Sequence, residues 1–202
     1  YEYYEKYGIR KYGAHGTSHM YVSQRLAEIV GKDLKDLKIV TCHLGQGSSI
    51  CAIKGGKSID TSMGLTPLGG IPMVTRSGDL DPSVVTYIMK KENLTPAQME
   101  DLLNKKSGLS GMSNLVPDFR EIEIASNEGQ PDAKIAVENF NYTIASYIAK
   151  YVSSQTNEFI TGNLPLAELD SFNATLKNMG IENMIALRQV QYNRYKKNLT
   201  ID

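Results

Sequence analysis

The densest group of chemically active side chains is the run of residues 12–19, where His15 and His19 stand four positions apart before a helical pattern. A helix N-terminus offers unpaired N–H groups and the positive end of a dipole, so this run predicts an anion site. Zinc is the weaker interpretation, because no third ligand is apparent. A histidine that donates to a phosphoryl oxygen is favoured, and a histidine that only packs the loop is the alternative.

A second group attaches an imidazole to a tight glycine turn. His43, Leu44, Gly45, Gln46 and Gly47 stand between two β-like runs, and two serines follow them. Glycines let backbone N–H groups approach a ligand closely, which is how many loops hold phosphate oxygens. A plain hairpin turn would need neither the histidine nor the paired serines, so the pattern favours a phosphate-binding function.

A third group is the run 75–79, in which Arg76 stands in a long loop rich in glycine and proline. A guanidinium binds carboxylate or phosphate oxygens in a fork and keeps its charge through a transition state. The alternative is a solvated or ion-paired arginine. A fainter group, residues 118–120, reads as the start of a helix. The residues alone therefore indicate an α/β enzyme that binds an anion.

Strand patterns surround the glycine turn and must position it. Short β-branched runs at 38–42 and 49–53 predict a hairpin, and 57–61 predicts a third strand. Residues 63–79 show no regular pattern. Cys42 and Cys51 lie in successive predicted strands without CxxC spacing, so we expect two reduced and buried thiols.

Helical patterns account for most of the remaining chain. Apolar spacing predicts a helix from residue 22 that ends at Gly31, with Ser18 as N-cap. Further helices are predicted after Asp81 and Thr95, and the longest over 131–153, packed on a mixed sheet. The last expectations are a strand at 158–161, a helix at 165–179 and a strand or helix at 181–190.

The composition narrows the classes of partner. The chain has 22 basic and 22 acidic residues, so no global field favours nucleic acid or an anionic membrane. No apolar run approaches the roughly 20 residues of a membrane span. We therefore expect a cytoplasmic protein whose partner is a small molecule, with no nucleic acid and no membrane.

Taken in order, these groups resemble the acetate kinase family over residues 3 to about 151. The motifs that carry the resemblance are Tyr-Gly-Ala-His-Gly-Thr-Ser-His at 12–19, His-Leu-Gly-Gln-Gly at 43–47, Asp-Thr-Ser-Met-Gly at 60–64, Thr-Pro-Leu at 66–68, Thr-Arg-Ser-Gly-Asp at 75–79 and Leu-Leu-Asn-Lys-Lys-Ser-Gly-Leu at 102–109. The resemblance implies a ribonuclease-H-like, actin-like kinase domain at 1–202, of the C-terminal type, with 154–202 divergent. It also implies a homodimer.

The activity that the resemblance implies is reversible phosphoryl transfer between ATP and acetate, or another short carboxylate, giving ADP and acetyl phosphate. His15 and Arg76 match the catalytic pair that stabilises the transferring phosphoryl group. The turn 43–47 matches the loop around the nucleotide phosphates. Pro67 matches part of the pocket for the acetate methyl group, where Ala14 replaces a usual phenylalanine and leaves room for a longer acyl chain.

Nucleotide recognition is where the chain departs from the family pattern. By resemblance, Asp118, Phe119 and Arg120 lie beside the adenosine. Gln46 replaces an asparagine, and residues 159–165 replace a glycine-rich adenosine loop. Mg²⁺ is implied, but its ligands, the catalytic aspartate and a second substrate arginine are expected outside this chain. We therefore expect an incomplete enzyme, and the alternative is an inactive or pyrophosphate-using homologue that serves as a binding or dimerisation module.

Overall fold

The computed structural model describes the backbone of residues 1–160 and the side chains of residues 1–151. Its contacts form two compact units, residues 1–148 and 149–202, and the four predicted groups of candidate site residues all lie in the first. The elements predicted at 165–179 and 181–190 lie outside the described residues. The single-domain prediction for 1–202 therefore stays a prediction.

A three-stranded antiparallel sheet forms in the order β1-β2-β3, from β1 (Lys38–Leu44), β2 (Ser48–Lys54) and β3 (Lys57–Thr61). The predicted hairpin and third strand are thus confirmed, and so is the α/β class. The pairing is antiparallel throughout, so the parallel strand of a mixed sheet does not occur within residues 1–160. Cys51 is buried as expected, whereas the expected burial of Cys42 is wrong. Cys51 pairs with Thr41 across the hairpin, and Cys42 is the next residue of β1, so it faces the opposite side of the sheet.

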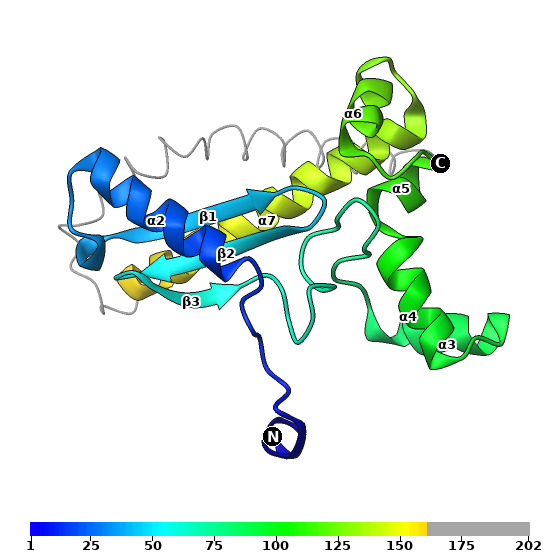
Figure 1. The fold of residues 1–202 in the computed structure, drawn as a ribbon, viewed down its shortest axis with the longest axis horizontal. Helices are drawn as coiled ribbons and strands as arrows, with labels where there is room; N and C mark the ends of the chain where they lie inside the picture. The colour runs from blue at the N-terminus through cyan, green and yellow to red at the C-terminus, as the bar shows by residue number, and fades with distance from the viewer. Residues whose placement is uncertain (161–202) are drawn as a thin grey trace. The chain divides into compact units, whose positions relative to one another are not determined.

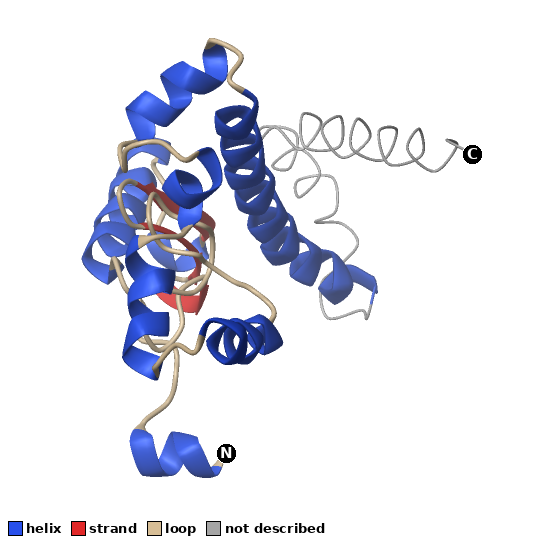
Figure 2. Ribbon diagram, turned by 90° about the vertical axis from the view of Figure 1, so that its right-hand side faces the viewer, coloured by secondary structure: helices blue, strands red, loops and turns tan. Residues whose placement is uncertain are grey.

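Helix α2 (Gly16–Val30) lies along one face of this sheet (Figures 1 and 2). Its buried positions His19, Ser23 and Ala27 recur every four residues, which places them on one stripe. Gly31 ends the helix as predicted. The expected N-cap at Ser18 is wrong, because the helix begins earlier and His15 is its N-cap.

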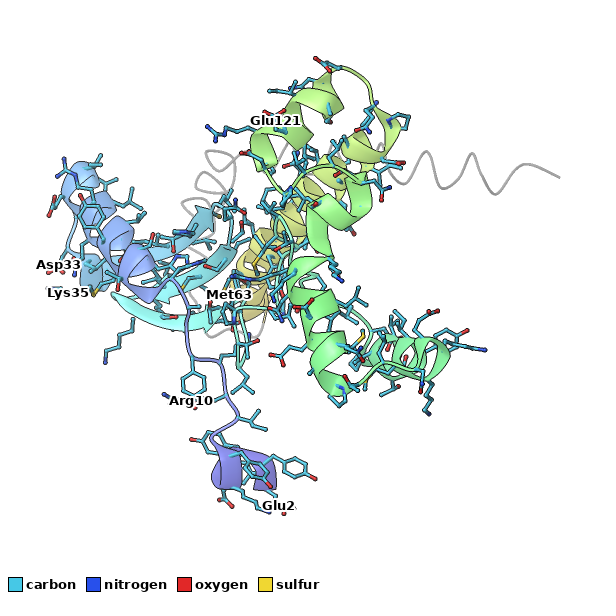
Figure 3. The ribbon with its side chains drawn as sticks, turned by 45° about the vertical axis from the view of Figure 1, so that its right-hand side comes forward. Glu2, Arg10, Asp33, Lys35, Met63 and Glu121 are labelled. Carbon is cyan, nitrogen blue, oxygen red and sulfur yellow. The ribbon has the colours of Figure 1, made fainter. Side chains whose placement is uncertain are left out.

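The ends of α2 connect to short helical turns. At its C-terminal end, Asp33 caps the 3₁₀ turn η1 (Leu34–Asp36) by accepting from the Lys35 N–H, and both side chains are labelled in Figure 3. Before it, α1 (Glu2–Tyr7) joins α2 through the segment that carries Arg10 (Figure 3). No residue of α1 is buried, so this helix contributes little to the core.

Past the sheet, the loop predicted at 63–79 has no helix or strand, and four helices follow it. These are α3 (Pro82–Glu92), α4 (Pro96–Lys105), α5 (Gly108–Ser113) and α6 (Phe119–Asn127). Asp81 caps α3, and Thr95 forms a full capping box with Gln98 on α4, as their sequences predict. Fully buried side chains lie in this loop, in α5 and in α6, namely Met63, Ile71, Met73, Leu109 and Ile122.

The longest helix, α7 (Pro131–Ile160), begins where the sequence predicts it. The strand predicted at 158–161 is wrong over its described part, because residues 158–160 continue this helix. Within the first unit, the Phe140 ring packs on Phe119 with 5.4 Å between centroids, and the Tyr147 hydroxyl donates to Asp79. The predicted packing of α7 on the sheet stays a prediction. No helix of the described residues is long and apolar enough to span a membrane.

Candidate functional site

Gly47 marks the point at which the two predicted catalytic side chains meet. A Cβ atom placed on Gly47 would lie 3.1 Å from Arg76 Nη1 and 3.3 Å from His15 Nε2. The two residues come from different elements, sixty-one positions apart, and the glycine turn forms the floor between them. The structure therefore brings His15, Arg76 and the 43–47 turn into one cluster, as the sequence predicts.

The His15 ring is fixed by its backbone and by two neighbours. As N-cap of α2 it has a positive φ of 64°, which is uncommon outside glycine and marks a position held by its surroundings. Its Nδ1 lies 2.8 Å from Ser49 Oγ on β2. Its ring stacks on His43 of β1, with 3.9 Å between centroids, while His43 Nδ1 lies 3.0 Å from Ser18 Oγ. Nε2 is thus the nitrogen that faces Gly47.

Arg76 extends from a loop whose backbone is hydrogen-bonded to the α4–α5 corner, residues 106–109. The Leu109 N–H donates to the Met73 carbonyl, and the Ser107 N–H donates to the Thr75 carbonyl, at 2.9 and 3.0 Å. Gly108 fits this corner because φ is +64° and a Cβ would lie 2.2 Å from the Met73 oxygen. The corner therefore fixes the backbone from which Arg76 extends.

The Arg76 guanidinium itself has weak partners only. Its Nη1 donates to the Pro67 carbonyl over 3.4 Å and lies 3.6 Å from Met73 Sδ. In the described part of the chain, no carboxylate lies within ion-pair distance of it. Among the described residues Arg76 therefore has no ion-pair partner, so the ion-paired alternative does not apply there. Its positive charge is available to an anionic ligand.

The electrostatics of the cluster favour an anion. Burial, then the neighbouring His43, then Arg76 lower the pKa of His15 from its usual value. Burial, followed by His15 and His43, also lowers the pKa of His19. The lowered pKa values show that added positive charge at His15 and His19 is unfavourable beside these neighbours, and a bound anion would offset that cost.

The glycine turn adds backbone donors beside the two side chains. The Gly45 N–H donates to the Gly47 carbonyl, and the Ser48 hydroxyl donates to the Gly45 carbonyl, which together close the turn. Within the described residues the N–H groups of Gln46 and Gly47 make no hydrogen bond. Leu44 and Gln46 are both exposed. The turn can therefore offer N–H groups to oxygens of a ligand.

The predicted acyl pocket and adenosine residues differ in how close they lie to this cluster. Ala14 is adjacent to His15, and Pro67 is exposed and contacts Arg76. By contrast, the Asp118 side chain caps α6 and pairs with Arg120 at 3.4 Å, and Phe119 packs on α7. Their adenosine role stays a prediction, since the described contacts give them structural roles.

The described residues of this cluster do not form a set of metal ligands. Among the described residues, no group of three histidines, cysteines or carboxylates could hold an ion. The three imidazoles instead face hydroxyls or one another. Mg²⁺ prefers carboxylate and other oxygen ligands, and the charged and imidazole side chains here do not fit it.

A cavity of about 420 Å³ lies beside the cluster without containing it. It is bordered by residues 10–13, by His19 and Ser23 of α2, and by Asp60 and Thr61 of β3. Arg76, His43 and Gly47 do not line it. The predicted catalytic residues His15 and Arg76 therefore lie outside the lining of this cavity.

Comparison with known proteins decides the family. The model of the acetokinase family matches residues 1–161, about four fifths of the chain. This chain belongs to the acetokinase family. An acetate kinase of Caldicellulosiruptor saccharolyticus is 58% identical over 153 residues, which cover 76% of this chain and 38% of that protein. One of Carboxydothermus hydrogenoformans is 57% identical over 154 residues, with the same coverage.

Solved structures of the same family share the fold. The acetate kinase of Porphyromonas gingivalis superposes with a TM-score of 0.74 at 47% identity, covering 76% of this chain and 39% of that one. A propionate kinase of Francisella tularensis subsp. tularensis gives 0.71 at 46% identity, covering 75% and 38%. Over the matched three quarters of the chain the fold is thus the expected kinase fold, and the chain spans less than two fifths of the length of these relatives.

Three residues of the cluster were not assigned a role from the sequence. Thr41, His19 and Ser49 line up behind His15 in a buried row of hydrogen bonds. The paired serines after the turn were the available signal for Ser49. His19 stands in the first motif, where its spacing from His15 suggests only a zinc ligand. Thr41 shows no sequence pattern that indicates a functional role, apart from its inward position on β1.

Proposed function

We propose that this chain carries the phosphoryl-binding part of an acetate-kinase-type active site. His15 and Arg76 would hold the phosphoryl group that passes between ATP and acetate, or another short carboxylate such as propionate. The observation that carries the proposal is the meeting of His15 Nε2 and Arg76 Nη1 on Gly47. The names of the relatives support a kinase and do not favour an inactive or pyrophosphate-using module.

The chemistry of the cluster suits an in-line transfer. As the γ-phosphoryl group leaves ADP for the carboxylate, charge spreads over its equatorial oxygens. Arg76 keeps its positive charge throughout and can bind two of these oxygens, while His15 Nε2 lies beside it at Gly47 and the turn would add backbone N–H donors. Ala14 and Pro67 would border the acyl group, and Asp118 to Arg120 would lie near the adenosine.

Other parts of the proposal reach beyond the cluster. A divalent ion such as Mg²⁺ would be held with the nucleotide by residues other than the described ones around Gly47, which do not fit it. A homodimer and a cytoplasmic location are proposed from the family resemblance. The described side chains of this chain would bind, orient and stabilise the transferring group.

A chimaeric enzyme tests this function directly. The 153 matched residues of this chain would replace the corresponding segment of the Caldicellulosiruptor saccharolyticus acetate kinase, to which they are 58% identical. We expect the chimaera to form acetyl phosphate from ATP and acetate. Arg76→Ala should lower kcat by about 100- to 1000-fold with little change in KM for ATP, since the charge acts mainly in the transition state.

The matched control is Arg25→Ala, an exposed arginine of α2 that pairs with Glu28. This substitution should leave kcat unchanged, because surface ion pairs contribute little. Equal losses in Arg76→Ala and Arg25→Ala, or an Arg76→Ala enzyme of normal kcat, would refute the proposed role.

A further inference from the structure

A row of buried hydrogen bonds runs from the β1–β2 ladder to the His15 ring. Thr41 Oγ1 lies 3.5 Å from the Cys51 carbonyl oxygen and 2.7 Å from His19 Nδ1. His19 Nε2 lies 2.8 Å from Ser49 Oγ, which in turn lies 2.8 Å from His15 Nδ1. Thr41 and His19 are each 4% exposed and Ser49 is fully buried, so bulk water has little access to this row.

The carbonyl end is consistent with one direction of this row. A carbonyl oxygen only accepts, so in the long 3.5 Å contact to Cys51 the Thr41 hydroxyl is the donor, and Thr41 then accepts from His19 Nδ1–H. A neutral His19 then has a bare Nε2, which accepts the single hydrogen of the Ser49 hydroxyl. Ser49 Oγ can only accept from its other neighbour, and the proton of a neutral His15 therefore lies on Nδ1.

The charge at the far end selects the same direction. His15 Nε2 and Arg76 Nη1 would both contact one Cβ on Gly47, so the guanidinium charge lies close to Nε2. A bare lone pair faces a cation favourably, whereas an N–H in that place would be repelled. The other ionisable groups that face His15 are the rings of His43 and His19. Neither of them is anionic, so they do not oppose this choice.

We propose that Thr41, His19 and Ser49 are positioning residues that hold neutral His15 in the Nδ1–H form. Nε2 then takes up a proton from hydronium or a buffer acid in the solvent when a phosphoryl anion binds at Arg76. The identity of the anion as a phosphoryl group rests on the proposed function, whereas the tautomer of ligand-free His15 does not depend on it. Only a proton moves, since the N–H···O bond to Ser49 persists in both states and the ring stays in place. His15 thus becomes a donor to the phosphoryl group only once the anion is present.

The first test reads the tautomer without any ligand. The full 202-residue chain contains three histidines, so long-range ¹H–¹⁵N spectra show three imidazoles, which single substitutions assign. Near neutral pH we expect His15 to carry its proton on Nδ1 and to show a bare Nε2. A His15 ring with its proton mainly on Nε2 would overturn the proposal.

Two variants test whether the row, and not His15 alone, sets this state. Ser49→Ala removes the acceptor of His15 Nδ1–H. Thr41→Val removes the acceptor of His19 Nδ1–H, at a residue three hydrogen bonds away from His15. Each should move His15 measurably toward the Nε2–H form. The matched control is Thr61→Val, also buried and on a strand, whose hydroxyl has no partner within the described residues. An unshifted His15 in both variants, or an equal shift in the control, would refute the relay.

Titration with inorganic phosphate separates this inference from the proposed function. We expect phosphate to protonate His15 Nε2 while the Nδ1–H signal remains. Phosphate that binds beside Arg76 and leaves His15 neutral would overturn the proton uptake. Failure of phosphate to bind at all would count against the proposed function, and the ligand-free spectra would still decide the tautomer.

Discussion

At the scale of single residues, the site depends on a side chain that is missing. Gly47 leaves open the point where His15 Nε2 and Arg76 Nη1 meet, and its backbone does not need a positive φ. A larger residue could therefore adopt the same backbone conformation but would occupy the space of the anion. This separation between folding and binding makes Gly47 the most informative single position.

Gly47→Ala should weaken anion binding without weakening the fold. The new Cβ would lie 3.1 Å from Arg76 Nη1, which is the mobile end of a long side chain and can shift. We expect the affinity for acetyl phosphate, measured by calorimetry, to fall about tenfold or more, which corresponds to about 1.4 kcal/mol. The free energy of unfolding should change by less than about 1 kcal/mol.

The control for this substitution is Gly64→Ala, where a Cβ would have no atom within 4 Å. That variant should bind acetyl phosphate as the unaltered chain does. If Gly47→Ala binds equally well, the anion does not occupy the space between His15 and Arg76.

The lowered histidine pKa values predict loss of stability in mild acid. Burial lowers the pKa of His15 and His19 below 6.5, so the unfolded chain binds more protons than the folded one in the interval between the two values. Stability should therefore fall as pH drops below about 6.5. Urea unfolding at about pH 7.5 and pH 5 measures this change.

Aspartates do not confuse that measurement. Hydrogen bonds lower the pKa of Asp33, Asp81 and Asp118 below 3.8, and their contribution is lost only as pH falls through these lower values. Equal or greater stability at pH 5 would show that the two histidines are not held neutral by their surroundings.

At the scale of elements, a hairpin, a helix start and a loop converge on the site. The hairpin supplies Ser49 and the glycine turn, α2 supplies His15 at its N-cap, and the α4–α5 corner holds the loop of Arg76. The corner makes no contact with a ligand in the proposal. Its contribution is to fix the backbone from which the guanidinium reaches the cluster.

Gly108→Ala should disrupt this corner and displace Arg76. The new Cβ would meet the Met73 and Arg76 carbonyl oxygens at 2.2 and 2.7 Å, in addition to the strain of a positive φ. Gly31→Ala is the matched control, because its φ is +65° but no atom lies within 4 Å. We expect the control to lose about 1 kcal/mol of unfolding free energy and Gly108→Ala to lose clearly more. Equal losses in urea unfolding would contradict a structural role of the corner.

Sequence patterns predict those elements well whose stabilising interactions are between residues close in the sequence. The strand runs, the cap at Asp81 and the capping box at Thr95 are read from neighbouring residues, and the structure has them in place. The N-cap of α2 was misplaced because Ser18 is a good cap by type, yet its hydroxyl faces His43 instead. That choice depends on a strand twenty-five residues away, which no local pattern contains.

The sequence predicts which residues form the candidate site better than it predicts the hydrogen bonds between them. Residue type and motif indicated His15, Arg76 and the glycine turn, since imidazole, guanidinium and close backbone N–H groups suit an anion. The row through Thr41 and Ser49 arises from strand pairing and from the helix lying over it. Such contacts across elements require the tertiary structure.

At the scale of the whole molecule, the chain spans 38% of the length of the curated acetate kinases it matches. The described cluster offers imidazoles, hydroxyls and a guanidinium, and among the described residues it offers no metal-binding group. A complete transfer also needs the nucleotide, its cation and the carboxylate to be held in line.

We therefore predict that the 202-residue chain alone forms no measurable acetyl phosphate from ATP, acetate and Mg²⁺. Proximity and orientation contribute on the order of 7 to 11 kcal/mol to such reactions, so loss of part of the apparatus should be severe. A coupled assay for ADP measures this directly. A turnover near the usual kinase range of about 1 to 100 per second would show that the chain suffices by itself.

The central claim is that one anion lies between His15 and Arg76 on the Gly47 turn, and a crystal structure with bound phosphate or vanadate tests it most directly. The account predicts a tetrahedral anion within hydrogen-bond reach of His15 Nε2 and the Arg76 guanidinium, close to where a Gly47 Cβ would lie. An anion bound elsewhere, such as in the cavity beside His19, with His15 and Arg76 unliganded at saturating concentration, would contradict it.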